Sequence, residues 1–506
     1  MPARRHLAAL LPILACLAGV SSGLPQQPTL TPVPTQAAAE PQRWSGSVRL
    51  PNEISVDLIV TLTPPTGTID IPMQGAKGVA LSEVQVTADA MSFTLLPPGA
   101  PPEAAARFSL TIQDGNTAIG SLVQGGATMP VKLTRLKEGE TATVTRKAQD
   151  PVPPFPYAEE EVTFANEQAE GVILAGTLTL PEGDGPFPAA ILVSGSGPQN
   201  RDSNLLGHRP FLVLADHLTR QGIAVLRYDD RGIGASTGDF TKATTRDFAK
   251  DTVAAVKFLR TREEIDPARV GIIGHSEGGI IAPIAAAELG DVGFLVLLAA
   301  PGVSGLELIP RQAEEISLSM GAEPDVARRQ GRVTRAILTV AASYAEVDEI
   351  RATIETQLRT LYKEMPETAS LTDEEREARV QAAVKEQLPS VSNVWYREFL
   401  RLDPRVALSQ VRCPVLAING AKDVQVPAEE NLATIQRTLE REGNTKVRIE
   451  TIPDLNHLFQ TAETGGPDEY ATIEETFAPV ALEMVAEWVR SVTGLVSEQE
   501  GAKSED

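Results

Sequence analysis

One segment carries the clearest chemical signal in the chain: Val270-Gly271-Ile272-Ile273-Gly274-His275-Ser276-Glu277-Gly278-Gly279. A G-x-S-x-G motif stands here between an apolar run, typical of a strand, and a run rich in Ala and Ile, Gly278 to Leu289, typical of a helix. The chain must turn sharply between the two, and Gly274 and Gly278 leave room where a β-carbon would collide with neighbouring backbone. The segment therefore predicts a nucleophilic Ser276 at the bend, beside helix amides that favour negative charge.

A serine nucleophile needs a base, and a single histidine stands where this arrangement requires one. The nucleophile, the acid and the histidine follow one another in that order along chains with this motif. Of the five histidines only His457 follows Ser276, in a loop after a strand-like run, Val447 to Ile452. His275 is next to the nucleophile, so we expect its side chain to leave the turn in another direction. His457 is therefore the predicted general base.

Two aspartates compete for the role of the acid that orients His457. Asp423 follows Pro414 to Ile418, a predicted strand, and so comes from a strand end of its own. Asp454 stands three residues before His457, on the same loop. We expect Asp423 to be the acid, because a carboxylate from a separate strand end can approach the imidazole from the side.

A tetrahedral intermediate needs amide donors for its negative oxygen. One predicted donor is the backbone N–H of Glu277, the residue after the nucleophile. The other is the N–H of Ser196, in the loop Ser194-Gly195-Ser196-Gly197-Pro198, which follows an apolar run. The alternative for this loop is a phosphate-binding turn, but the third spaced glycine and the helix start of such loops are missing.

A charged segment follows another apolar run: Arg227-Tyr228-Asp229-Asp230-Arg231-Gly232-Ile233-Gly234-Ala235-Ser236-Thr237-Gly238. Its charges predict an ion-pair network buried after a strand, and its glycines predict a tight turn. We interpret the segment as architectural rather than catalytic. We likewise expect the carboxylate of Glu277 to support the site without taking part in the chemistry.

Around these motifs apolar runs alternate with helical runs, which predicts an α/β fold with a doubly wound, mostly parallel sheet covered by helices on both faces. The predicted strands include Ala189 to Val193, Ile223 to Tyr228, Val270 to Ile273 and Phe294 to Leu298. The predicted helices include Phe211 to Gly222, Phe248 to Arg262, Gly278 to Leu289 and Phe477 to Val492.

From Trp44 to Leu136 the apolar residues instead alternate with a period of two, as at Ile54, Val56 and Leu58. Short alternating runs between turn signals predict a small all-β domain, an antiparallel sandwich or barrel, ahead of the α/β domain. The region has no histidine and no convergent set of titratable groups, so we expect it to play a structural or positioning role.

Composition narrows the class of protein. The 506 residues carry a formal net charge of −22, and a surface that acidic repels phosphates, which argues against nucleic-acid binding. The body has no apolar run of the roughly 20 residues that cross a bilayer. The two cysteines, Cys16 and Cys413, are too few for a disulfide framework.

Residues 1–23 have the layout of a secretory signal peptide, with Arg4 and Arg5 before an apolar run and small residues after it. The alternative is a buried N-terminal helix. Cys16 ends a stretch similar to a bacterial lipobox. The signal could therefore instead be cleaved before Cys16, with a lipid then attached to this cysteine as an anchor. We expect an exported protein, periplasmic or extracellular. The other predicted parts are a flexible linker (24–43), the β domain (44–136), a second linker (137–155), the α/β domain (156–495) and an acidic tail (496–506).

Taken together, the motifs resemble the α/β-hydrolase superfamily, and within it the serine-aminopeptidase-like branch that includes EstD-type esterases. The shared pieces are SGSGPQNRD, RYDDRGIGASTGDF, GHSEGG, WYREFLRLDP, NGAKDVQVP and LNHLF. By this resemblance Ser276, Asp423 and His457 hold the triad roles of the family. Ser194 stands where the family often has a histidine, so the details of the oxyanion hole depart from the common pattern.

The resemblance also implies a helical cap in the insertion from Gly305 to Leu402, which is rich in Glu, Arg, Ala, Leu and Gln. Such a cap shapes the substrate pocket and excludes water. Trp395, Tyr396 and Phe399 are candidate pocket aromatics. The alternative is that they pack the cap onto the sheet.

The predicted function is that of an exported serine esterase, which hydrolyses a small-molecule carboxylic ester through an acyl-enzyme without cofactor or metal. A serine aminopeptidase-type peptidase or a thioesterase would use the same three residues, so both stay open. A non-catalytic binding protein on a hydrolase scaffold is a further alternative, and it would predict an incomplete set of catalytic residues. The sequence does not indicate an oligomeric state.

Overall fold

The computed structural model describes residues 41–49, 55–71, 76–96, 105–124, 127–137, 139–140, 142, 146–365, 368 and 370–495. The predicted signal peptide with Cys16, nearly all of the predicted linker 24–43 and the acidic tail lie outside these residues, so export and lipidation stay predictions. The described chain divides into two units, one of residues 41–150 with 203–209 and one of residues 151–202 with 210–495.

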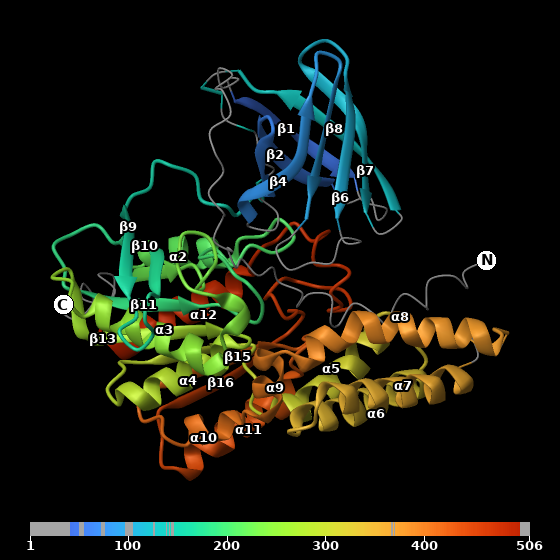
Figure 1. The fold of residues 1–506 in the computed structure, drawn as a ribbon. Coiled ribbons are helices and arrows are strands. Elements are labelled where there is room, and N and C mark those ends of the chain that lie inside the picture. The colour runs from blue at the N-terminus through green and yellow to red at the C-terminus, as the bar shows by residue number, and fades with distance from the viewer. Residues whose placement is uncertain are drawn as a thin grey trace, which may run out of the picture. The chain divides into compact units, whose positions relative to one another are not determined.

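Eight antiparallel strands close into a barrel that forms the body of the first unit (Figure 1). Their bounds are β1 (Gln42–Arg49), β2 (Ser55–Thr63), β3 (Thr66–Ile71), β4 (Ala76–Val86), β5 (Ala90–Leu95), β6 (Ala106–Ile112), β7 (Thr117–Gln124) and β8 (Ala127–Arg135). Every second side chain of β6 is buried, as a barrel strand requires. Trp44, Leu62 and Phe93 lie in the apolar interior. The predicted antiparallel β domain is confirmed, and it is a barrel.

An eight-stranded sheet organises the second unit, in the order β16-β15-β14-β13-β11-β12-β10-β9. The strands are β9 (Ala158–Ala165), β10 (Ile173–Leu180), β11 (Phe187–Val193), β12 (Ala224–Tyr228), β13 (Ile265–His275), β14 (Leu295–Leu298), β15 (Val415–Gly420) and β16 (Val447–Ile452). Strands β11 to β16 pair in parallel, whereas β9 and β10 form an antiparallel pair at one edge. Because the parallel strands share one direction, their carboxyl ends meet at one edge of the sheet.

Helices cover both faces of this sheet (Figure 1), which confirms the predicted doubly wound α/β fold. One face is covered by α3 (Thr245–Leu259), α4 (Gly278–Leu289), α10 (Pro404–Leu408) and α11 (Ala428–Arg441). The other is covered by α2 (Pro210–Arg220) and α12 (Pro479–Thr493). Within the described residues no helix combines the length and apolarity that crossing a membrane requires.

The insertion between β14 and α10 is helical, as expected, and forms the cap: α5 (Gly305–Ser319), α6 (Pro324–Ala342), α7 (Val347–Glu364), α8 (Asp373–Ser392) and α9 (Val394–Arg401). The cap has an apolar cluster of its own, in which Tyr396 and Phe399 are 2% and 5% exposed. These two aromatics therefore pack the cap, which was the alternative to a pocket role. Trp395 is only partly buried and contacts both the cap cluster and the cluster of the sheet.

Candidate active site

Ser276 lies on a sharp turn between β13 and α4, at the carboxyl end of a central strand. Its φ of 55° is in the left-handed region, which is strained for a residue with a β-carbon. The flanking glycines make the turn possible. A β-carbon on Gly274 would stand 2.1 Å from the carbonyl oxygen of Gly278, and one on Gly278 would stand 2.2 Å from that of Val193. The turn thus presents Ser276 as the sequence predicted.

His457 and Asp423 meet Ser276 from two other strand ends. His457 follows β16, and its Nε2 is 3.1 Å from Ser276 Oγ. Asp423 follows β15, and its Oδ2 is 2.8 Å from His457 Nδ1. His457 and Asp423 are both 5% exposed, so the chain of hydrogen bonds is shielded from solvent. The three predicted side chains therefore lie in series over a sequence separation of 181 residues.

Backbone amides fix the orientation of the Asp423 carboxylate. Its Oδ1 accepts from the N–H of Gln425 at 2.8 Å and from that of Val426 at 2.9 Å, which leaves Oδ2 for His457. Asp454, the alternative acid, instead pairs with Lys422 at 2.9 Å, and its side chain is 65% exposed. The geometry separates the two candidates in favour of Asp423.

His275 does not leave the site as expected but reaches back to the loop of His457. Its Nε2 donates to the backbone carbonyl of His457 at 2.9 Å, and the two ring centres are 4.9 Å apart. Burial lowers the pKa of His275 from 6.5 to about 3, with a further contribution from His457. The neutral ring thus holds the loop that carries the candidate base. Sequence analysis missed this role, because it needs the position of a loop far along the chain.

We expect His275 to make the protein sensitive to acid. Because the pKa of this ring is about 3 in the folded state and near 6.5 in the unfolded chain, the unfolded chain takes up a proton first, so stability falls as the pH drops below about 6.5. The variant His275→Gln keeps an N–H donor but cannot titrate. We compare the free energy of unfolding of the variant with that of the parent, measured with denaturant. The difference, variant minus parent, should rise by about 2 kcal/mol when the pH is lowered from 7.5 to 4.5. A constant difference across this range would contradict the expectation.

The loop after β11, residues Ser194–Gln199, lies against the nucleophile. A β-carbon on Gly195 would stand 3.0 Å from the Cβ of Ser276. Within the described residues, neither the N–H of Ser196 nor that of Glu277 has a hydrogen-bond acceptor. Free amides beside a serine nucleophile are what an oxyanion hole needs. The nearby hydroxyl of Ser196 helps to lower the pKa of the Glu277 carboxyl, against the larger effect of burial, which raises it.

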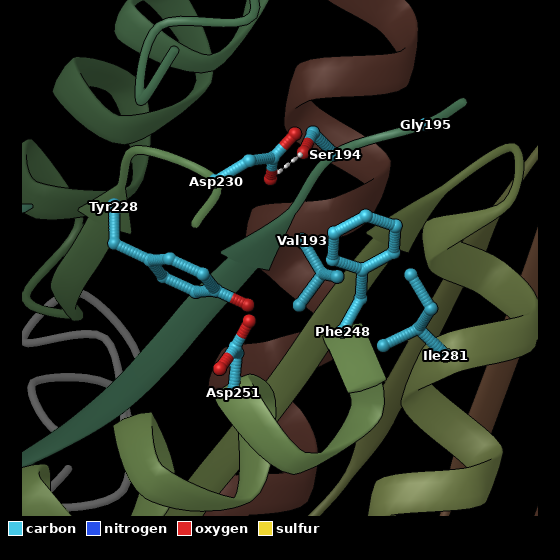
Figure 2. Close-up of a pocket in the computed structure, with 8 residues that line it drawn as sticks. All are labelled: Val193, Ser194, Gly195, Tyr228, Asp230, Phe248, Asp251 and Ile281. Carbon is cyan, nitrogen blue, oxygen red and sulfur yellow. Dashed lines mark hydrogen bonds between the residues drawn. The ribbon is translucent and has the colours of Figure 1, made fainter. Parts of the chain in front are cut away.

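The charged segment after β12 holds this loop in place. Asp230 accepts from Ser194 Oγ at 3.0 Å and from the N–H of Gln199 at 2.9 Å, and so clamps both ends of the loop. Figure 2 shows the bond between Asp230 and Ser194 at the rim of a small pocket behind the loop. Burial raises the pKa of Asp230 well above its usual value. Its neighbour Asp229 accepts from the N–H and the guanidinium of Arg201 at 2.8 to 3.2 Å.

The same segment contains the predicted ion pairs: Arg201 with Asp229, Arg227 with Asp202 and Arg231 with Asp251. The predicted ion-pair network is therefore present, and the architectural role stays our interpretation. The sequence did not indicate which segment this network holds. Nothing in the residues between Arg227 and Gly238 predicts a contact with the loop at Ser194.

Asp230→Ala is expected to lower kcat by about 30-fold with little change in KM, because both ends of the loop that carries the Ser196 amide lose their acceptor. Asp230→Asn should recover much of the loss, since its amide oxygen still accepts from Gln199. Steady-state ester hydrolysis, together with thermal melting to verify folding, measures both variants. A folded Asp230→Ala protein with the parent kcat would rule out the clamp.

Comparison with known proteins places this geometry in a family. The family model described as Serine aminopeptidase, S33 matches residues 209–463, about half of the chain, and spans Ser276, Asp423, His457 and the cap. The chain belongs to this family. The resemblance predicted from the sequence motifs is thereby confirmed.

Individual relatives of this S33 family member are distant. Esterase EstD of Thermotoga maritima is 26% identical over 322 residues, which are 63% of this chain and 65% of EstD. The uncharacterized protein YfhR of Escherichia coli is 31% identical over 25% of this chain and 41% of YfhR. The match thus spans less than two thirds of either relative. Among solved structures, the Pyrococcus furiosus esterase Pf2001 is 17% identical over 67% of this chain and 91% of its own, with a TM-score of 0.39.

Proposed function

We propose that this protein is a serine hydrolase that cleaves carboxylic esters through an acyl-enzyme on Ser276. The observation that carries the proposal is the series of hydrogen bonds from Asp423 Oδ2 to His457 Nδ1 at 2.8 Å and from His457 Nε2 to Ser276 Oγ at 3.1 Å. A nucleophile, a base and an orienting acid at these distances form the arrangement that acyl transfer uses on many folds.

In the proposed mechanism Ser276 Oγ attacks the ester carbonyl while His457 Nε2 takes the hydroxyl proton. The negative oxygen of the tetrahedral intermediate accepts from the N–H groups of Ser196 and Glu277. His457, held by Asp423, then gives its proton to the departing alcohol, and an ester between Ser276 and the acyl group remains. Water activated by His457 attacks this acyl-enzyme, which releases the acid and restores the serine.

Two observations favour esters over substrates with a free amine. The Glu277 carboxylate, which lies next to the nucleophile, already accepts hydrogen bonds from Thr245 and Trp395 on Oε1, so part of its capacity to bind an ammonium group is taken. In addition, the Thermotoga relative of this chain is named an esterase.

A second candidate is an aminopeptidase, which is what the description of the family model names. The observation in its favour is Glu398 on α9. Its Oε1 pairs with Arg246 at 3.1 Å, but its buried Oε2 has no hydrogen-bond donor within the described residues. An unpaired carboxylate oxygen on the cap could receive the amine of a substrate.

An activity panel on the purified protein tests both candidates. It compares p-nitrophenyl acyl esters, acyl thioesters and aminoacyl anilides at equal concentrations. The proposal expects kcat/KM to be highest on the esters, by at least about 100-fold over the anilides. Preference for the anilides, lost in Glu398→Gln, would favour the aminopeptidase. No turnover of any of the three classes would argue for a binding protein.

A further inference from the structure

Glu277 places a buried carboxylate one residue from the nucleophile. The residue is 2% exposed, and burial raises the pKa of its side chain. Its Oε1 accepts from Thr245 Oγ1 at 2.6 Å and from Trp395 Nε1 at 2.9 Å, and the nearby Ser196 hydroxyl helps to lower the pKa of the carboxyl against the larger effect of burial. Within the described residues it forms no ion pair.

Such a group is costly to bury. A carboxylate buried without a cation loses its hydration, which neutral donors only partly replace. An apolar side chain could fill the same volume without this penalty. The buried carboxyl group is therefore expected to have a use, and groups whose pKa values are shifted by burial are concentrated at functional sites.

The three donors come from three separate parts of the unit. Thr245 begins α3, Ser196 lies on the loop after β11, and Trp395 lies on α9 of the cap. Trp395 also packs against both the cap cluster and the cluster of the sheet, so its ring sits at the seam between them. The carboxylate therefore contacts both α3 and the cap from the nucleophile turn.

We propose that the Glu277 carboxylate is a positioning group that sets the oxyanion hole, by tying the Ser196 loop and the cap residue Trp395 to the nucleophile turn. The inference rests on the proposed function and deepens it. The two residues whose N–H groups are assigned to the hole are then joined through their side chains as well. The carboxylate then helps the loop to hold their spacing, and the cap takes part through the bond from Trp395.

Removing the link should affect the transition state more than substrate binding. In Glu277→Leu the Ser196 hydroxyl loses its partner, and the Ser196 amide moves out of line with the oxyanion. Loss of one such donor costs about 100- to 1,000-fold in other enzymes, so its displacement is expected to lower kcat by about 30-fold while KM changes by less than about threefold. Glu277→Gln keeps an acceptor for Trp395, so its kcat is expected to be at least about tenfold higher than that of Glu277→Leu.

A tetrahedral inhibitor separates positioning from a general loss of stability. A boronic acid bound to Ser276 mimics the intermediate, so its affinity for Glu277→Leu should fall by about the same factor as kcat/KM. A lower kcat with unchanged boronic acid affinity would overturn the proposal. Thermal melting verifies that the compared proteins are folded.

A double-mutant cycle tests whether Trp395 acts through the carboxylate. Trp395→Phe keeps the ring but removes the N–H, and we expect kcat to fall by about fivefold in the parent and not at all in Glu277→Leu. Trp488→Phe, on α12 at the other face of the sheet, is the matched control and should leave kcat unchanged. Equal effects of Trp395→Phe in both backgrounds would overturn the link to the cap. If Glu277→Leu does not fold, the same cycle is run with Ser196→Ala in its place.

The outcome is distinguishable from failure of the proposed function. If the parent protein hydrolyses esters and Ser276→Ala does not, the proposed function stands, and a Glu277→Leu protein with the parent kcat then overturns this inference alone. If the parent protein hydrolyses no ester, the proposed function fails first, and this inference fails with it.

Discussion

Replacing Ser276 with alanine is expected to lower kcat for ester hydrolysis by about 10⁶-fold, because Ser276 carries the hydroxyl that is hydrogen-bonded to His457 Nε2 and would form the acyl-enzyme. The backbone amides of Ser196 and Glu277 remain, so a small rate above that of water should persist. Steady-state kinetics on a p-nitrophenyl ester, with thermal melting to verify the fold, gives the measurement. Since the alanine still has a β-carbon at a φ of 55°, the turn itself should be retained.

The control for this variant is Ser491→Ala on α12, whose hydroxyl only donates to a backbone carbonyl of its own helix. It should behave as the parent protein. A folded Ser276→Ala variant within about tenfold of the parent kcat would show that the reaction uses another nucleophile.

Asp423→Asn is expected to lower kcat by about 10⁴-fold with KM nearly unchanged. In the parent protein the Asp423 carboxylate accepts a hydrogen bond from the Nδ1–H of His457 at 2.8 Å, which leaves Nε2 free to accept the proton of Ser276. An asparagine can turn its NH₂ toward Nδ1. The imidazole would then carry its proton on Nε2, where it cannot act as a base.

Asp454→Asn is the matched control, because Asp454 is the other aspartate near His457 and pairs with Lys422 instead. Its kcat should stay within about threefold of the parent. The reverse result, a large loss of kcat in Asp454→Asn and a small loss in Asp423→Asn, would show that Asp454 is the acid and that our assignment of Asp423 is wrong.

The principal residues of the site could be predicted because the fold orders them along the chain. A strand, a glycine-flanked serine and a helix indicate the nucleophile, and only one histidine follows it. The acid required a choice between Asp423 and Asp454, and the end of a separate strand was the deciding criterion. These inferences need local pattern and chain order but no distances.

The supporting residues could not be predicted because their roles depend on distances between remote segments. Asp230 was recognised as part of a charged network, but its contact with the loop at Ser194 exists only once β11 and β12 pair. His275 was expected to turn away, yet it holds the loop of a residue 182 positions later. The bond from Trp395 to Glu277 likewise depends on where the cap lies.

The strands that the sequence did not indicate have physical reasons of their own. In β9, the run Glu159-Glu160-Glu161 hides the alternation, because the strand is at the edge of the sheet and largely exposed. In the barrel, β3 reads Thr-Gly-Thr-Ile-Asp-Ile, with a single fully buried residue, Ile69. A strand such as β3, which pairs with β2 and β4, is specified by its neighbours more than by its own pattern.

The central claim is that Ser276 is the nucleophile of a working hydrolase, and covalent labelling tests it most directly. The purified protein is treated with a fluorophosphonate, and the adduct is located by mass spectrometry of its peptides. The account predicts a single adduct on Ser276, formed much more slowly in Asp423→Asn. An intact protein that hydrolyses esters but carries no label, or carries it on another residue, would contradict the account.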